Sequence, residues 1–144
     1  MANERDGLTT IRSIAVTAED VVDAFGYTRE NPGEAVLRVT PPFHGRMRAR
    51  LHVFQVDDSP ETGAIHLEPA RLLDDEAVDV YPTLESVAAT MGESVDPDPE
   101  TVRKRHAVAL EAWRRQAQTA IVGAIDIDTE VGSHRVSVSV LGQP

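Results

Sequence analysis

The sequence contains no cysteine, only one lysine and few aromatic residues. Without cysteine, the chain cannot form disulfides, bind a metal through thiolates or use a cysteine nucleophile. Its apolar runs are far shorter than the roughly 20 residues that a membrane-spanning helix needs, and the segment from Met1 to Asp6 is too polar for a secretory signal. We therefore expect a cytoplasmic protein that has no disulfides and does not enter a membrane.

Negative charge dominates the composition. Acidic residues outnumber basic ones by 24 to 14, the formal net charge is -10, and Lys104 is the only lysine. Excess carboxylates keep a protein surface hydrated and soluble. This composition, together with the block VLRVTPPFHGRMRARLHV from Val36 to Val53, resembles small uncharacterised haloarchaeal proteins of no assigned function. The resemblance implies an acidic protein of an extreme halophile and implies no particular activity.

Length and helix signals predict a single α+β domain over residues 1–144. A chain of this size removes roughly 70% of its unfolded surface from water, which is enough for one core. The helix signals are hydroxyl or carboxyl N-caps followed by apolar residues at helical spacing. They predict helices over Ala18–Phe25, ended by Gly26, over Thr83–Met91 and, longest, near residues 99–120, with an end left open between Thr119 and Ala124.

Strand signals lie before and after the helical middle of the chain. They are short runs rich in β-branched or alternating residues: Thr9–Val16, Ala35–Thr40, His44–Val53, Gly63–Pro69, Ile125–Asp128 and His134–Val140. Short connections between neighbouring runs favour antiparallel pairing. We therefore expect a mainly antiparallel sheet of about five or six short strands, with two or three helices on one face. The apolar side of the longest helix, which includes Leu110 and Trp113, is expected to pack on this sheet.

The run from His44 to Val53 alternates between cationic and apolar side chains, the period-two pattern of a strand with one buried face. It is expected to form a hairpin with residues 35–40, and the neighbouring apolar residues Val53 and Phe54 suggest a bulge or burial on both faces. The outward side of this strand and its surroundings form a candidate interaction surface. Its residues are Arg38, Phe43, His44, Arg46, Arg48, Arg50 and His52.

Two interpretations of these arginines are open. Arginine forks match phosphates, so the strand could bind nucleic acid. Alternatively, the arginines pair with carboxylates across the sheet or on a covering segment such as Asp74 to Asp79, and we favour this second interpretation because molar salt screens long-range attraction. Phe43 likewise has two interpretations, contact with a partner or closure of the core at the end of a hairpin.

No pattern of catalytic or metal-binding residues stands out. The sequence lacks the HExxH motif, a glycine-rich phosphate loop and a recognisable triad. His106 lies within the apolar stripe of the longest helix, which favours a structural role. Asp126, Asp128 and Glu130 alternate as cation ligands do, but the following residues do not fit an EF-hand loop. We expect no catalytic residue, no metal and no cofactor.

The absence of chemistry favours a non-catalytic interaction or adaptor module. It would use the basic strand or the longest helix to contact a partner protein or a second copy of itself. The alternative is a nucleic-acid-associated accessory protein that binds through Arg46, Arg48 and Arg50.

Overall fold

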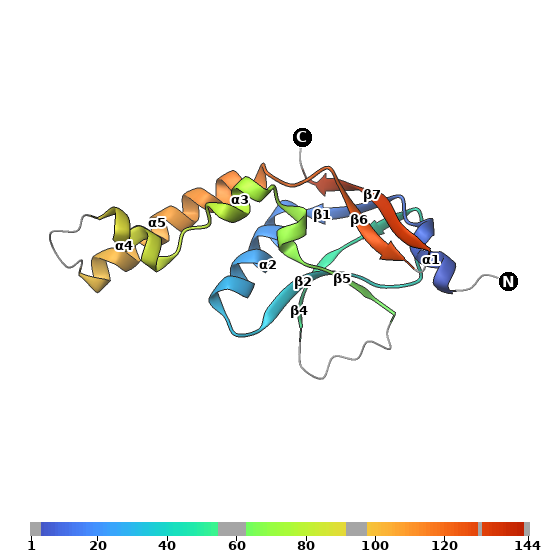
Figure 1. Cartoon of the computed structure of the whole chain (residues 1–144), viewed down its shortest axis with the longest axis horizontal. Coiled ribbons are helices and arrows are strands. Elements are labelled where there is room, and N and C mark those ends of the chain that lie inside the picture. Colours follow the sequence, from blue (N-terminus) through green and yellow to red (C-terminus); the bar gives the residue numbers. More distant parts are fainter. Residues whose placement is uncertain (1–3, 55–62, 92–97, 130, 143–144) are drawn as a thin grey trace.

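Two β-sheets form one part of the molecule, and a group of helices extends from them (Figure 1). The computed structural model describes residues 4–54, 63–91, 98–129 and 131–142. The helices are α1 (Glu4–Thr10), α2 (Ala18–Glu30), the 3-10 helix η2 (Pro69–Leu72), α3 (Asp75–Asp79), α4 (Leu84–Thr90) and α5 (Pro99–Gln118). The strands are β1 (Ser13–Thr17), β2 (Glu34–Val39), β3 (Arg46–Arg48), β4 (Arg50–Phe54), β5 (Ile65–Leu67), β6 (Ala124–Thr129) and β7 (Gly132–Leu141). The α+β prediction is confirmed.

The sheets are of two kinds. One has the strand order β3-β1-β7-β6 and the other the order β4-β2-β5. In the four-stranded sheet, β1 is parallel to both of its neighbours, while β6 and β7 form the expected antiparallel hairpin. The three-stranded sheet is antiparallel throughout. The four-stranded sheet is therefore mixed, because β1 pairs with strands that the chain reaches only through long connections.

A single extended segment joins the two sheets. Only the fully buried Ala49 separates β3 from β4; β3 pairs with β1, whereas β4 pairs with β2. The predicted single strand from His44 to Val53 is thus two strands, which begin at Arg46 and are separated at Ala49. The predicted hairpin with residues 35–40 holds for β4 only. Of the two possibilities at Val53 and Phe54, the bulge is wrong, since β2 and β4 pair one to one from Glu34 opposite Phe54 onward. Burial on both faces depends on the Phe54 side chain, which lies outside the described part of the structure.

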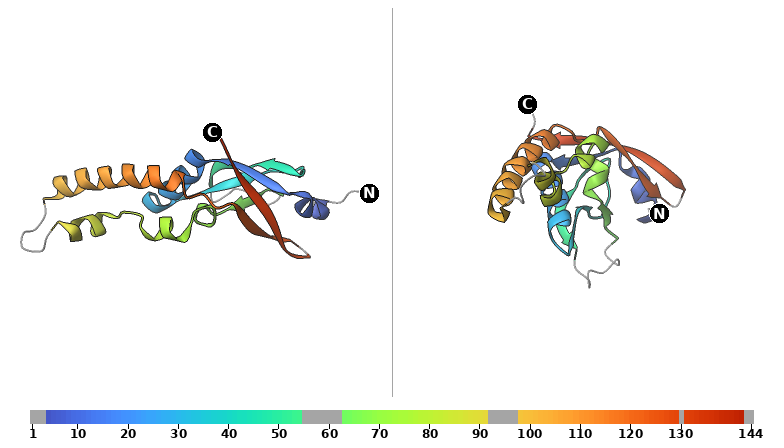
Figure 2. Two further views of the ribbon diagram at one scale, coloured as in Figure 1. Left: turned by 90° about the horizontal axis from the view of Figure 1, so that it is seen from above. Right: turned by 60° about the vertical axis from the view of Figure 1, so that its left-hand side comes forward.

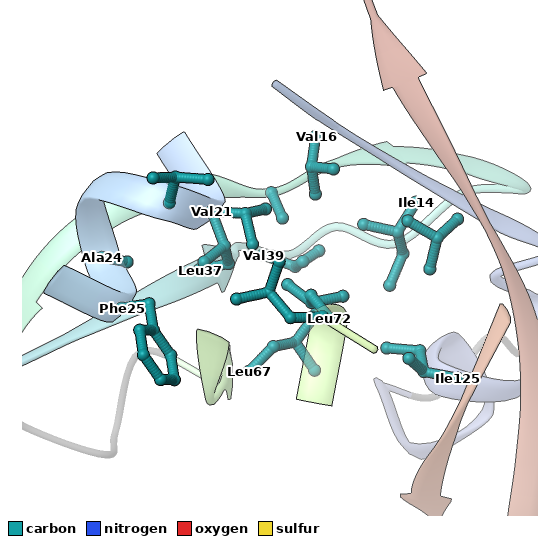
Figure 3. Packing of buried hydrophobic residues seen from close by; sticks show 14 of the residues in the cluster. Ile14, Val16, Val21, Ala24, Phe25, Leu37, Val39, Leu67, Leu72 and Ile125 are labelled. Atoms are coloured by element: carbon teal, nitrogen blue, oxygen red, sulfur yellow. The ribbon is translucent and has the colours of Figure 1, made fainter. Parts of the chain in front are cut away.

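Helix α2 packs on the inner side of the three-stranded sheet and brings Val21 and Phe25 against Leu37 (Figure 3). Thr17 caps the helix as expected, its hydroxyl accepting a hydrogen bond from the Asp20 N–H. The prediction that Gly26 ends the helix is wrong, because the helix continues to Glu30. A helical glycine costs only about 1 kcal/mol, and contacts beyond it offset that cost.

Those contacts come from Thr28, which links the end of α2 to the start of β2. Its hydroxyl donates to the carbonyl of Ala24 and accepts from the N–H of Ala35 at 3.0 Å.

The predicted first strand, Thr9–Val16, also needs correction, since Thr9 and Thr10 end helix α1 and the strand begins only at Ser13. Threonine has a weak local preference for strands, which tertiary context overrides here.

Helix α5 follows the predicted limits but has different neighbours from those expected. It begins after Asp98, whose carboxylate accepts from the Thr101 N–H, and it ends at Gln118. It packs against α2, α3 and α4, so the prediction that it packs on the sheet is wrong. Its N-terminal half and α4 extend away from the sheets (Figure 2). We call these two elements the arm; Val87 and Val102 are buried within it.

Three aromatic rings fix α5 to the body of the protein. Phe25, Tyr81 and Trp113 form a cluster with ring centroids 4.8 to 5.4 Å apart. The indole N–H of Trp113 donates to the carbonyl oxygen of Ala77 at 2.8 Å. Edge-on and stacked rings at these distances stabilise one another beyond their burial. The cluster therefore sets the direction in which the arm leaves the body.

Tyr81 makes the stability of this cluster dependent on pH. Burial, together with the carboxylate of Glu30 that accepts the phenol's hydrogen bond, raises the pKa of Tyr81 to about 12. The unfolded chain releases this proton near pH 10, where the folded protein still holds it, so folding stability falls as the pH rises between about 10 and about 12. We expect Tyr81→Phe to flatten this fall in urea-unfolding midpoints. An unchanged alkaline slope in Tyr81→Phe would contradict the assignment.

Candidate interaction surface

The even-numbered side chains of the β3–β4 segment share one side of the sheets. Met47, Ala49 and Leu51 lie on the core side with their strand neighbours, so the alternation turns the intervening arginines outward. Neighbouring strands add further basic residues on this outward side. We call the resulting set the basic strand face: Arg38, Arg46, Arg48, Arg50, His52 and His66.

The half of this face over the three-stranded sheet is a group of arginines and histidines. Arg38 lies directly opposite Arg50 on one neighbouring strand and opposite His66 on the other. The Arg38 Nη1 atom is 3.4 Å from Nδ1 of His52, and the rings of His52 and His66 are stacked with centroids 5.7 Å apart. Basic side chains from three strands therefore meet at one place.

The other half lies over the four-stranded sheet. Arg46 pairs in register with Ser13, and Arg48 pairs with Ala15. These small neighbours leave Arg46 exposed, while Arg48 is half-buried along its length. Within the described part of the chain, the buried Nε atom of Arg48 makes no hydrogen bond. Among the described residues, the Arg48 side chain therefore has no carboxylate or other acceptor of its own.

The expected carboxylate partners of the central arginines are not observed. Across the described ranges, no aspartate or glutamate lies within ion-pair distance of Arg46, Arg48 or Arg50. The acidic segment that was expected to cover them, Asp74 to Asp79, instead lies beside α5. On the outward side of β6 and β7, an ion pair joins Arg135 to Asp126 at 3.5 Å.

Phe43 closes the core and does not project from the loop. It is half-buried against the main apolar cluster. Its ring lies so close to α1 that a Cβ atom on Gly7 would come within 2.9 Å of it. His44 is exposed at the start of the basic segment, with its N–H directed at the sulfur of Met47. Most of the candidate residues thus lie on the basic strand face, whereas Phe43 packs in the core and His44 is exposed beside that face.

Comparison with known proteins identifies a family. The sequence profile of a family described as "Domain of unknown function (DUF8009)" matches residues 1–142. The chain belongs to this DUF8009 family. No curated protein and no solved structure gives a match.

The remaining histidines of this DUF8009 chain have structural contacts. Nε2 of His106 is 3.0 Å from the carbonyl oxygen of Pro82, which ties α5 to the segment before α4. Nε2 of His134 is 2.6 Å from the carbonyl oxygen of Ile11. Among the described residues, no three His, Asp or Glu side chains are grouped to hold a metal ion. Asp126 and Asp128 are exposed on β6, and Glu130 lies outside the described residues.

A second surface of the DUF8009 chain lies along the C-terminal half of α5, the helix that was also expected to contact a partner or a second copy. An open groove of about 700 Å³ runs between α5 and the segment from Asp74 to Pro82. Val108, which is exposed on α5 outside the predicted apolar stripe, neighbours the groove without lining it. None of the described helices is long and apolar enough to cross a bilayer.

Proposed function

We propose that the protein is a non-catalytic interaction module that binds an acidic surface of a partner protein through the basic strand face. The observation that carries the proposal is that Arg46, Arg48 and Arg50 have no carboxylate partner in the described part of a chain with a net charge of -10. An acidic protein has many carboxylates with which to pair such arginines. Three arginines that face outward without such a pair favour binding to an external partner.

The cross-strand register supports the same proposal. Arg38 and Arg50 lie directly opposite each other in neighbouring strands, an arrangement of like charges that destabilises a sheet. The Arg50 guanidinium can bind a carboxylate of a partner through two parallel hydrogen bonds. A carboxylate of a partner beside Arg50 would therefore make this register more favourable on binding.

A protein partner suits this surface better than nucleic acid does. Carboxylates lie on the same outward faces: Asp126 and Asp128 on β6, Glu34 at the start of β2 and Glu68 just after β5. A polyphosphate crossing these faces would meet repulsion at the edges, whereas a protein surface of mixed charge can match them. We place this module in the cytoplasm of an extreme halophile, where only close charge pairs escape screening.

The test compares binding to an acidic polypeptide with binding to DNA. Labelled poly-L-glutamate and a mixed-sequence DNA duplex are titrated with the protein, in salt at which circular dichroism shows the native fold. We expect poly-L-glutamate to bind better than the duplex. Arg48→Ala should weaken that binding about fivefold or more, because it removes a close charge pair.

The matched control is Arg103→Ala, which removes the same charge from an exposed position on α5. It should change the affinity less than about twofold. Tighter binding to the duplex, lost in Arg48→Ala, would replace the proposal with the nucleic-acid alternative. Equal effects of the two substitutions, or no binding to either probe, would contradict a docking role for the basic strand face.

A further inference from the structure

The groove beside α5, which we call the arm groove, is lined mainly by apolar side chains. One wall is formed by Ala77, Val80 and Pro82, and the other by Ala109, Ala112 and Trp113. Val80 is 64% exposed on one wall, and Val108, which neighbours the other, is 71% exposed. Single exposed valines are ordinary on a protein surface. Two of them beside one apolar groove indicate a surface that can gain by being covered.

Unpaired charges of opposite sign lie near the two ends of this groove. Asp74 and Glu76 line it beside the C-terminal half of α5. Arg105 lies beyond the other end, on α5 one turn before the lining residue Ala109. In the described part of the chain, none of the three is in an ion pair, although Lys104 beside Arg105 pairs with Glu100. The surface is therefore negative at one end, apolar in the middle and positive at the other end.

From this arrangement we infer that a second copy of the chain docks in the arm groove, with the two α5 helices antiparallel about a two-fold axis. A two-fold axis superimposes each end of a surface on the opposite end of its copy. The positive end of each arm groove therefore meets the negative end of the other. This charge complementarity is what selects a second copy as the occupant.

The positions of Arg105 and Glu76 along α5 fit a two-fold axis that crosses this helix at Leu110. Arg105 of one copy then lies level with residue 115 of the other, since the rise of 1.5 Å per residue is the same on both sides of the axis. Glu76 lies close to that level, because the segment runs antiparallel to α5 from Asp74 beside Ala120 to Ala77 beside Trp113. Each Arg105 thus faces the Glu76 of the other copy.

The same axis sets the apolar contacts. Val108 of one copy lies opposite Ala112 of the other, so an exposed valine meets a small side chain on the groove wall. Helices that meet through small side chains pack at the short end of the usual 8–10 Å range. The contact is confined to one groove and the facing side of a single helix, less than the roughly 20–30 residues that each partner contributes to a standard interface. The dimer is accordingly weak and depends on protein concentration.

Sedimentation equilibrium over about a hundredfold range of concentration tests this dimer. The wild type should move from monomer towards dimer as its concentration rises. Ala112→Glu should abolish association, because it places a charge in the centre of the contact. Ala107→Glu is the matched control, since it adds the same charge at an exposed position on another side of α5 and should leave association unchanged. Circular dichroism verifies that both variants are folded.

A charge exchange tests the pairing itself. Arg105→Glu and Glu76→Arg should each weaken association about tenfold, and the double variant should return to within about threefold of the wild type. A wild type that stays monomeric at every concentration would overturn the inference. So would a dimer that survives Ala112→Glu, or a double variant that fails to recover. Arg48→Ala should not affect association, which separates this surface from the basic strand face.

Discussion

Trp113→Ala is expected to lower the free energy of unfolding by about 3 to 5 kcal/mol, the cost of deleting a large buried aromatic side chain. Trp113 is only 5% exposed and contacts both other rings of the aromatic cluster. Removing it leaves a cavity where α5 meets α2, and it leaves the carbonyl of Ala77 without the indole donor. Urea unfolding followed by circular dichroism measures the loss.

Trp113→Phe separates these two contributions. It keeps an aromatic ring beside Phe25 and Tyr81 but removes the N–H that donates to Ala77. We expect it to cost less than half as much as the alanine substitution, because ring burial is the larger contribution. The wild-type protein offers a simple check, since its only tryptophan is Trp113. A fluorescence maximum typical of solvated indole would contradict the burial described here.

Leu37→Ala is expected to cost about 2 to 5 kcal/mol for the same reason at the centre of the three-stranded sheet. Leu37 is fully buried on the middle strand, between Leu51 on β4 and Leu67 on β5, and it faces helix α2 (Figure 3). The cavity cannot fill easily, because its walls are sheet neighbours held by backbone hydrogen bonds.

Leu51→Ala provides a matched control in the same strand pair. Leu51 lies directly opposite Leu37 but is 38% exposed. The same deletion there removes less buried surface, and it should cost at least about 1 kcal/mol less than Leu37→Ala. Equal losses at the two positions would show that Leu51 is covered, and would contradict the described arrangement of α2 on this sheet.

The sequence allowed elements with strong local signals to be predicted. The alternation from His44 to Val53 is a property of neighbouring residues, so the extended segment could be identified without its partners. The N-caps Thr17, Thr83 and Asp98 act within one helical turn, and all three cap the expected helices. Local chemistry was sufficient in each of these cases.

The sequence did not allow the partners of these elements to be predicted. The division of the basic segment at Ala49 depends on β1 and β2, which lie far from it along the chain. The stripe that includes Leu110 and Trp113 fits a sheet or other helices equally well, because a helix buries an apolar face in the same way against either. Packing on α2, α3 and α4 is decided by tertiary contacts.

The residues of the candidate surface could be predicted from the sequence, but the side chains that surround them could not. Its arginines follow from the alternating pattern, whereas the position of the acidic segment Asp74 to Asp79 depends on long-range contacts. A backbone hydrogen bond from Asp74 to Ala120 and the bridge between Leu73 and Ile121 hold that segment beside the end of α5. This placement removes the expected partners of Arg48 and leaves the basic strand face outward.

The most direct test of this account is the free energy of unfolding of Arg48→Ala compared with that of the wild type. If Arg48 has no internal carboxylate partner, as the described residues indicate, the substitution should change the free energy by less than about 1 kcal/mol. A loss of several kcal/mol would show that Arg48 makes strong internal contacts, either with a buried acid or through packing of its side chain. Arg48 would then stabilise the fold, which would contradict a binding role for the basic strand face.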